Sequence, residues 1–240
     1  GVFLSINNGT SWTAVNAGLT SPDVRALAVN GGNLFAGTWG SGVFVSANSG
    51  TSWNQVINGL TNMIVQSFAV SGGNLFAGTN GGVFLSANSG ANWTAANTGL
   101  TNVITALAVS GGNLFAGTNG FGVFVSTNSG TSWAPANAVE FPDIHALAVN
   151  GSSLFAGTSG GAYVSTNGGA NWTAINTGLK ATIVNALAFS GSFLFAGTNG
   201  GGILVSGDNG TSWSRVSTGP GYPYIYSLLV SGSNIIAGSY

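Results

Sequence analysis

The chain contains very few charged side chains and no cysteine. Of its 240 residues, 3 are Lys or Arg and 4 are Asp or Glu, so the formal net charge is −1. An average soluble domain is about 25% charged. Nucleic-acid binding is excluded as a main role, because neutralising phosphates requires many cations, and so is polybasic attachment to a membrane. Without cysteine, disulfides, thiolate metal sites and cysteine nucleophiles are excluded as well.

Histidine, long apolar runs and strong helix formers are also scarce, which limits the possible fold classes and cofactors. A single His excludes a histidine metal cluster, and we expect neither a metal nor a cofactor. No apolar run approaches the roughly 20 residues of a membrane-spanning helix, so we expect no membrane partner. The 41 glycines and the small number of strong helix formers argue against a helical fold.

Tryptophan recurs about every forty residues along the whole chain. Successive positions are separated by 41, 40, 40, 39 and 41 residues, at Trp12, Trp53, Trp93, Trp133, Trp172 and Trp213. Six repeats of forty residues account for the full length, which predicts a single domain over residues 1–240. Because the chain begins with Gly1 rather than Met, we expect it to be processed or cut from a longer parent.

Each repeat contains four short apolar runs, which we call A, B, C and D. In the first complete repeat they span Val24–Val29, Asn33–Thr38, Val43–Ser46 and Trp53–Ile57. Runs of this length, rich in Val, Phe, Ile and Trp and bounded by Gly, Asn and Ser, predict β-strands. The Gly31-Gly32 pair between A and B is typical of a two-residue hairpin turn.

Four antiparallel strands in forty residues are typical of one blade of a β-propeller, and blades bury their faces against one another. Residues 1–16 carry only a C and a D strand, and residues 224–239 carry only an A and a B strand. We therefore predict an all-β, six-bladed β-propeller in which the N-terminal strands join the C-terminal strands as the sixth blade. Such closure leaves no exposed sheet edge and favours a monomer. A parallel β-helix is the alternative, but it does not explain the two strands at each end.

Between strands C and D every repeat carries Ser-x-Asn/Asp-x-Gly-x-x-Trp, which we call the box. The copies span residues 5–12, 46–53, 86–93, 126–133, 165–172 and 206–213. The motif resembles the Asp-box, or BNR, repeat of sialidases, sortilin-type ectodomains, xyloglucan hydrolases, a photosystem assembly factor and certain bacterial lectins, although only Asp208 keeps the acid. The Asx side chain is expected to accept hydrogen bonds from the following turn amides, and the Trp to fill the core. A ring of calcium or sugar sites is the alternative role.

The loops between D and A and between B and C, predicted to share one face, carry most of the differences among the repeats. The second position of strand A varies most in chemistry: Arg25, Gln66, Thr105, His145, Asn185 and Tyr226. Strand A is the innermost strand of a propeller, so these side chains are predicted to line the mouth of a central channel. Trp39, Phe121 and Tyr224 would be rim aromatics. This lining suits a neutral polar ligand, with binding that changes near pH 6–7 as His145 titrates; a wet mouth that tolerates any polar residue is the alternative.

The same residues argue against catalysis. Sialidases, which the boxes resemble, hold a substrate carboxylate with three Arg, whereas this chain has two, and Arg215 lies in a D strand away from the predicted mouth. The loop carboxylates Asp23, Glu140 and Asp143 are explained as turn formers beside Pro. We predict a non-catalytic module, extracellular or on a cell surface, that binds a carbohydrate or a peptide. A bare repeat scaffold, recently amplified or engineered, is the alternative, and a sialidase-like glycoside hydrolase is a more distant one.

Overall fold

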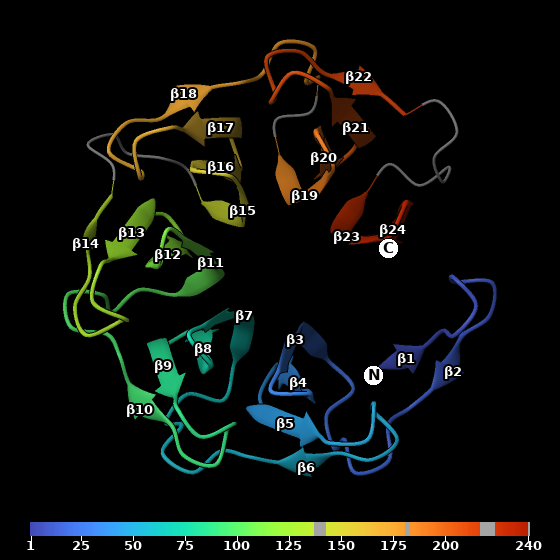
Figure 1. Ribbon diagram of the computed structural model, residues 1–240, viewed down its shortest axis with the longest axis vertical. Coiled ribbons are helices and arrows are strands. Elements are labelled where there is room, and N and C mark those ends of the chain that lie inside the picture. Colours follow the sequence, from blue (N-terminus) through green and yellow to red (C-terminus); the bar gives the residue numbers. More distant parts are fainter. Residues whose placement is uncertain (137–142, 181–182, 217–223, 240) are drawn as a thin grey trace. The chain divides into compact units, whose positions relative to one another are not determined.

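A computed structural model describes residues 1–136, 143–180, 183–216 and 224–239 (Figure 1). All regular structure in these ranges is β-strand, 24 strands in total, and the fold is that of a six-bladed β-propeller, which confirms the predicted class. The chain divides into two compact units. The first comprises Gly1–Ala116 with Ser126–Ala134, and the second comprises Gly117–Val125 with Pro135–Tyr240.

The strands repeat in the predicted order, with long A and B strands and short C and D strands. The A strands are β3 (Val24–Asn30), β7 (Val65–Ser71), β11 (Ile104–Ser110), β15 (Ile144–Asn150), β19 (Val184–Ser190) and β23 (Ile225–Ser231). The B strands are β4 (Asn33–Thr38), β8 (Asn74–Thr79), β12 (Asn113–Thr118), β16 (Ser153–Thr158), β20 (Phe193–Thr198) and β24 (Asn234–Ser239). The C strands are β1 (Phe3–Leu4), β5 (Val43–Ser46), β9 (Gly82–Ser86), β13 (Val123–Ser126), β17 (Gly161–Ser165) and β21 (Gly202–Ser206). The D strands are β2 (Thr13–Ala14), β6 (Asn54–Gln55), β10 (Thr94–Ala95), β14 (Ala134–Pro135), β18 (Thr173–Ala174) and β22 (Ser214–Arg215).

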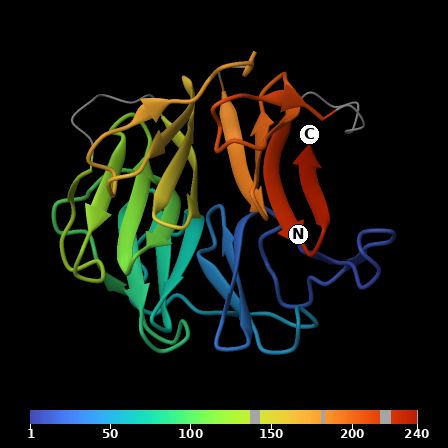
Figure 2. The ribbon, with the colours of Figure 1, turned by 45° about the horizontal axis from the view of Figure 1, so that its top comes forward.

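Five sheets have four strands in the order A-B-C-D, and we call them blades one to five: β3–β6, β7–β10, β11–β14, β15–β18 and β19–β22. The strands at the two ends form separate two-stranded sheets, β1–β2 in the first unit and β23–β24 in the second. Figure 2 shows β23 and β24 side by side, in red. Each end therefore supplies the half blade that the sequence predicts, and the joining of the two halves into one sheet stays a prediction.

The A–B hairpins have the turn that their glycines predict. Asn30 of β3 pairs with Asn33 of β4, so the turn contains only Gly31 and Gly32. Both have positive φ, 58° and 82°, which suits a tight hairpin between twisted strands. Nothing lies within 4 Å of a Cβ placed on either glycine. Glycine is therefore needed here for its positive φ and not because a side chain would not fit.

Small residues in the B strands let neighbouring blades approach closely. A Cβ placed on Gly37 of β4 would lie 2.6 Å from the Cγ1 of Val65 in the next A strand. In the second unit, a Cβ on Gly157 of β16 would lie 2.8 Å from the Cγ1 of Val184. In the same unit, the rings of Phe155 and Phe189 pack edge to face with centroids 5.0 Å apart. The repeated Ala-Gly of strand B is thus the contact surface for the next blade.

In the first unit no blade precedes β3, and Leu27 and Val29 of this strand are 53% and 66% exposed. In β7 the corresponding Phe68 lies against Gly37, so this face of an A strand packs on the preceding blade. Within its own unit β3 has no A–B hairpin before it, and its apolar side chains are therefore uncovered.

The boxes are compact turns closed by their own side chains. In the second blade, Ser86 Oγ donates to Asn88 Oδ1 at 3.0 Å and accepts from the Gly90 amide at 2.8 Å. Asn88 Oδ1 also accepts from the Asn92 amide at 2.9 Å. Asp208 accepts from the backbone amide of Ser212 at the same distance. Asn and Asp are equivalent acceptors here, as the sequence predicts.

Substitutions at Asn88 test this role. Asn88→Asp is expected to leave the free energy of unfolding nearly unchanged, because Asp208 already makes these hydrogen bonds. Asn88→Ala is expected to cost about 1–3 kcal/mol, since the turn amide and hydroxyl lose their acceptor. Urea denaturation of the two variants measures the difference. Equal losses for both would show that the side-chain oxygen is not what stabilises the turn.

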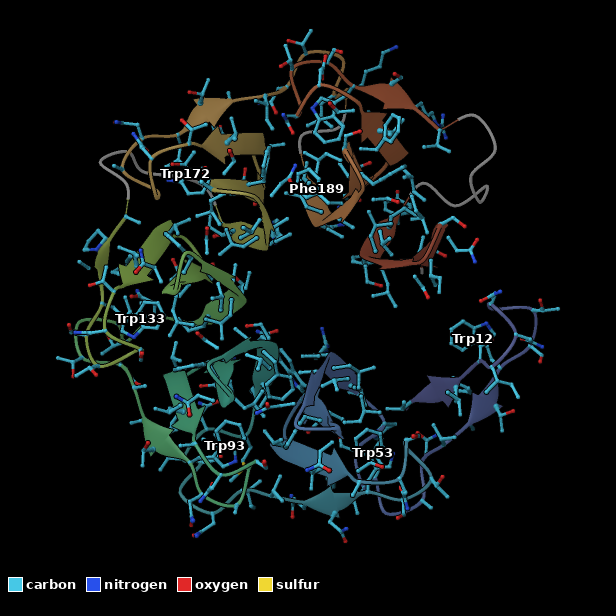
Figure 3. The ribbon with its side chains drawn as sticks, viewed as in Figure 1. Trp12, Trp53, Trp93, Trp133, Trp172 and Phe189 are labelled. Atoms are coloured by element: carbon cyan, nitrogen blue, oxygen red, sulfur yellow. The ribbon has the colours of Figure 1, made fainter. Side chains whose placement is uncertain are left out.

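The box tryptophans join each blade to the one before it. Trp93 is 2% exposed, and its indole Nε1 donates to the Val56 carbonyl of the preceding repeat at 2.9 Å. Trp53, Trp133 and Trp213 make the same bond and are also buried. Figure 3 labels Trp53 and Trp93 beside their sheets. The predicted burial is therefore confirmed at these four positions.

Trp12 departs from this pattern. Its side chain is 50% exposed, and its burial in a joined sixth blade stays a prediction. Its sheet, β1–β2, is the first of its unit, and no D strand precedes it there to cover the ring or accept its indole N–H. Burial of a box Trp thus depends on the preceding blade and not on the box alone.

Candidate functional site

The predicted site residues occupy a special position of the A strands. In the pairing of β3 with β4, Val24 opposes Thr38 and Ala26 opposes Gly37, which leaves Arg25 as an extra residue. The same shift in register occurs at Gln66, His145, Asn185 and Tyr226. Such β-bulges re-aim a side chain relative to strand alternation. The bulge, and not the simple alternation of the strand, sets the direction of these side chains.

The six residues at the second position of strand A belong to both units. Arg25, Gln66 and Thr105 lie in the first unit, and His145, Asn185 and Tyr226 lie in the second. Their convergence around one channel mouth stays a prediction. Of the loop residues named with them, Glu140 lies outside the described residues.

In the first unit, Arg25, Asp23 and Trp39 form one exposed cluster. Arg25 donates to both carboxylate oxygens of Asp23, at 2.6 and 3.0 Å. The guanidinium carbon of Arg25 lies 4.7 Å from the Trp39 ring centroid. The Trp39 amide donates to the Asp23 carbonyl at 2.9 Å. The hydrogen bond from Arg25 lowers the pKa of Asp23, so this carboxylate stays ionised at neutral pH.

Two further bulge residues contact the first residue of the B–C turn in their own blade. Gln66 Nε2 donates to Asn80 Oδ1 at 3.0 Å. His145 Nε2 lies 3.0 Å from Ser159 Oγ. Apart from Trp39, which occupies the equivalent position, the sequence analysis did not identify these turn residues. The A–B hairpin has a fixed register, so the second residue of strand A lies near the residue that follows strand B. This spacing was the signal in the sequence that could have paired the two positions.

The remaining residues at the second position of strand A differ in their surroundings. Asn185 Nδ2 donates to the Ile225 carbonyl of the next A strand at 3.0 Å, which makes it a bond between strands of the second unit. Tyr226 is exposed, and Thr105 is half-buried. The side chains at this position therefore have different surroundings, and a shared ligand-binding role for them stays a prediction.

The predicted rim aromatics all reach the surface. Trp39 is 44% exposed, and Phe121 and Tyr224 are also exposed. Trp39 is held by a β-bridge to Ile64, and Tyr224 by a β-bridge to Asn199. A Cβ on Gly120, beside Phe121, would lie 3.5 Å from Asp143 Oδ1. The second unit thus places the exposed Phe121 near Asp143, which precedes β15. The first unit places Trp39 near Asp23, which precedes β3, in the same way.

His145 is half-buried, and its protonation state follows from that. Burial lowers its pKa below 6.5, and the opposing charge of Asp143 only partly offsets this effect. The side chain is therefore neutral at pH 7 and gains its charge only below pH 6.5.

The lowered pKa of His145 predicts a pH-dependent stability. The unfolded chain binds a proton near pH 6.5 while the folded chain resists it, so stability is full above pH 6.5 and falls as the pH drops toward the folded pKa. Replacing His145 with Gln is expected to flatten the unfolding free energy between pH 7 and pH 5. Thermal denaturation at successive pH values measures this. A slope that persists in His145→Gln would assign it to another group.

A family model described as the DUF6242 beta propeller domain matches residues 10–146, more than half of the chain. No curated protein shows a significant match.

Solved structures share the fold at low sequence identity. An ancestral GH74 enzyme is 21% identical with a TM-score of 0.77, over 96% of this chain and 36% of its own. The structure of YCF48 bound to D1 peptide is 21% identical with a TM-score of 0.75, over 96% of this chain and 80% of that one. The extracellular domain of a putative hybrid two component system from B. thetaiotaomicron is 17% identical with a TM-score of 0.77, over 92% and 31%. The chain spans about a third of the length of the first and third of these.

Proposed function

Since the chain belongs to the family of the DUF6242 beta propeller domain, we propose that it is a non-catalytic binding module for a neutral polar ligand, a carbohydrate or a peptide. The observation that carries this proposal is the exposed Trp39 ring, fixed by Arg25 and by its β-bridge to Ile64. An anchored aromatic ring binds the apolar face of a sugar or a side chain without a large loss of conformational entropy. Because Asp23 neutralises Arg25, the surface favours an uncharged ligand.

The state of Asp23 supports a role without catalysis. A glycosidase of the ordinary kind needs a protonated carboxyl group as its general acid. Asp23 is ionised and engaged with Arg25 through both oxygens, so it has no proton to donate.

The comparisons support the proposed partner and location. One neighbour of the same fold is the structure of YCF48 bound to D1 peptide, and another is an extracellular domain. We propose a peptide or carbohydrate partner, an extracellular or cell-surface location, and a monomer. In the described part of the chain, no helix has the length and apolarity to cross a membrane.

A glycan array and a peptide array, followed by titration of the best ligand, test this function. Trp39→Ala is expected to weaken binding at least tenfold, and Phe193→Ala, which removes an exposed aromatic at an A–B hairpin, is expected to leave it unchanged. The double variant Arg25→Ala, His145→Ala tests the predicted mouth. Binding that survives both Trp39→Ala and the double variant would remove this site, and turnover of an aryl glycoside would overturn the non-catalytic role.

A further inference from the structure

Two of the three cationic side chains of the protein line one pocket in the second unit. The pocket has a volume of about 450 Å³ and is lined by Gly178, Lys180, Gly200, Gly201, Leu204, Trp213 and Arg215. It is formed by blade five together with the segment that leads from β18 into β19. The sequence analysis had set Arg215 aside because it lies in a D strand.

Both cations are departures from the repeat. Arg215 is the second residue after a box Trp, where the other repeats have Ala14, Gln55, Ala95, Pro135 and Ala174. Lys180 follows a Gly-Leu pair, where three other repeats have Thr20, Thr61 and Thr101. The repeat framework therefore requires neither charge. Two exceptional cations, separated by 35 positions of the printed sequence, therefore line one cavity.

Among the described residues, no acidic side chain balances these charges within the pocket. The described lining contains no carboxylate, and in the same ranges neither Lys180 nor Arg215 forms an ion pair. The Arg215 Nη2 lies 3.6 Å from the place of a Cβ on Gly202, which puts the guanidinium beside the turn between β20 and β21. Two unpaired cations at a concave surface attract an anion.

The rest of the lining suits a small organic molecule. Leu204 and Trp213 supply an apolar wall. In the turn between B and C, Gly201 stands where blade one has Ser41 and blade three has Phe121, so no side chain projects from this position. The volume lies within the range of about 300–1,000 Å³ that is usual for ligand pockets.

We propose that this pocket binds a small molecule bearing a carboxylate, the size of a monosaccharide or an acylated amino acid. The guanidinium of Arg215 donates two N–H groups to the two carboxylate oxygens, the pairing that its planar fork favours. Lys180 supplies the second positive charge, and Leu204 and Trp213 contact the apolar part. The site uses none of the residues of the neutral-ligand site and does not rest on it.

Matched pairs of probes test the charge requirement. The protein is titrated with D-glucuronate and with D-glucose, and separately with N-acetylalanine and its amide, while ¹H–¹⁵N spectra follow the Trp213 indole and the Arg215 Nε–H signals. We expect saturable shifts with one or both carboxylates, at least tenfold weaker binding of the uncharged partners, and weakening by added salt. The acid that binds more tightly identifies a sugar acid or a peptide terminus as the ligand type. Equal shifts with the charged and uncharged partners would overturn the proposal.

Three variants separate the site from a general charge effect. Lys180→Ala and Arg215→Ala are each expected to weaken binding of the carboxylate about tenfold, and Gly201→Phe, which copies blade three, is expected to block it. Ser214→Ala, beside Arg215 on β22, is the matched control and should bind like the unaltered protein. An unchanged melting temperature shows that each variant is folded. Binding that persists in the Lys180→Ala, Arg215→Ala double variant would place the anion elsewhere and overturn the assignment.

Discussion

Trp93→Ala is expected to lower the free energy of unfolding by about 3–5 kcal/mol, the range for truncating a buried aromatic residue. The Trp93 ring packs in a cluster with Phe35, Leu60 and Phe84. Its indole N–H bonds to the Val56 carbonyl, and its backbone amide donates to the Asn58 carbonyl at 2.8 Å. The substitution therefore leaves a cavity between two blades, and the Val56 carbonyl loses its hydrogen-bond donor. Guanidinium denaturation followed by circular dichroism measures the change.

An exposed aromatic provides the comparison. Phe121→Ala removes a ring that lies mostly in solvent and is expected to change stability by less than about 0.5 kcal/mol. A Trp93→Ala variant that kept its stability but lost binding to a sugar would reverse the assignment and make the box Trp a ligand platform.

Gly59→Ala is expected to cost about 2–5 kcal/mol, although Gly59 is exposed. A Cβ on Gly59 would lie 2.1 Å from the carbonyl oxygen of Trp93, a backbone atom that cannot turn aside. The residue also has φ of 83°, which costs a side-chain-bearing residue about 1–2 kcal/mol. The blades must separate locally to admit the methyl group, and this adds about 1–3 kcal/mol.

Gly73→Ala is the matched control for backbone strain. Gly73 has the same φ of 83°, but no atom lies within 4 Å of the Cβ that alanine would add. Its expected cost is therefore only the strain of about 1–2 kcal/mol. Chemical denaturation of both variants gives the difference. Equal costs would mean that the contact between residue 59 and the Trp93 backbone does not limit how closely the blades pack.

The local architecture could be predicted from the sequence because its causes are local. Gly31 and Gly32 specify a two-residue hairpin through their own φ angles. Ser86 and Asn88 close the box turn with hydrogen bonds that span at most four residues. Six copies of these signals, spaced by about forty residues, identify the blades, their strands and the class of the fold.

The candidate site required the register between paired strands, which the pattern of residues along the chain does not show. The β-bulge at Arg25 comes from the register between two strands, and that register re-aims the side chain against simple alternation. Burial of a box Trp likewise needs the strand of a preceding blade, as the bond from Trp93 to the Val56 carbonyl shows.

The sequence by itself determined the repeat, the strands, the turns and the variable column at the second position of strand A, since each depends on residues close together in the chain. The tertiary structure alone decided which distant side chains share a site. It placed the Arg25 guanidinium against the Trp39 ring and brought Lys180 and Arg215 to one cavity beside blade five. The physical reason is range: a hydrogen-bonded turn is complete within a few residues, whereas a pocket exists only after distant segments have packed.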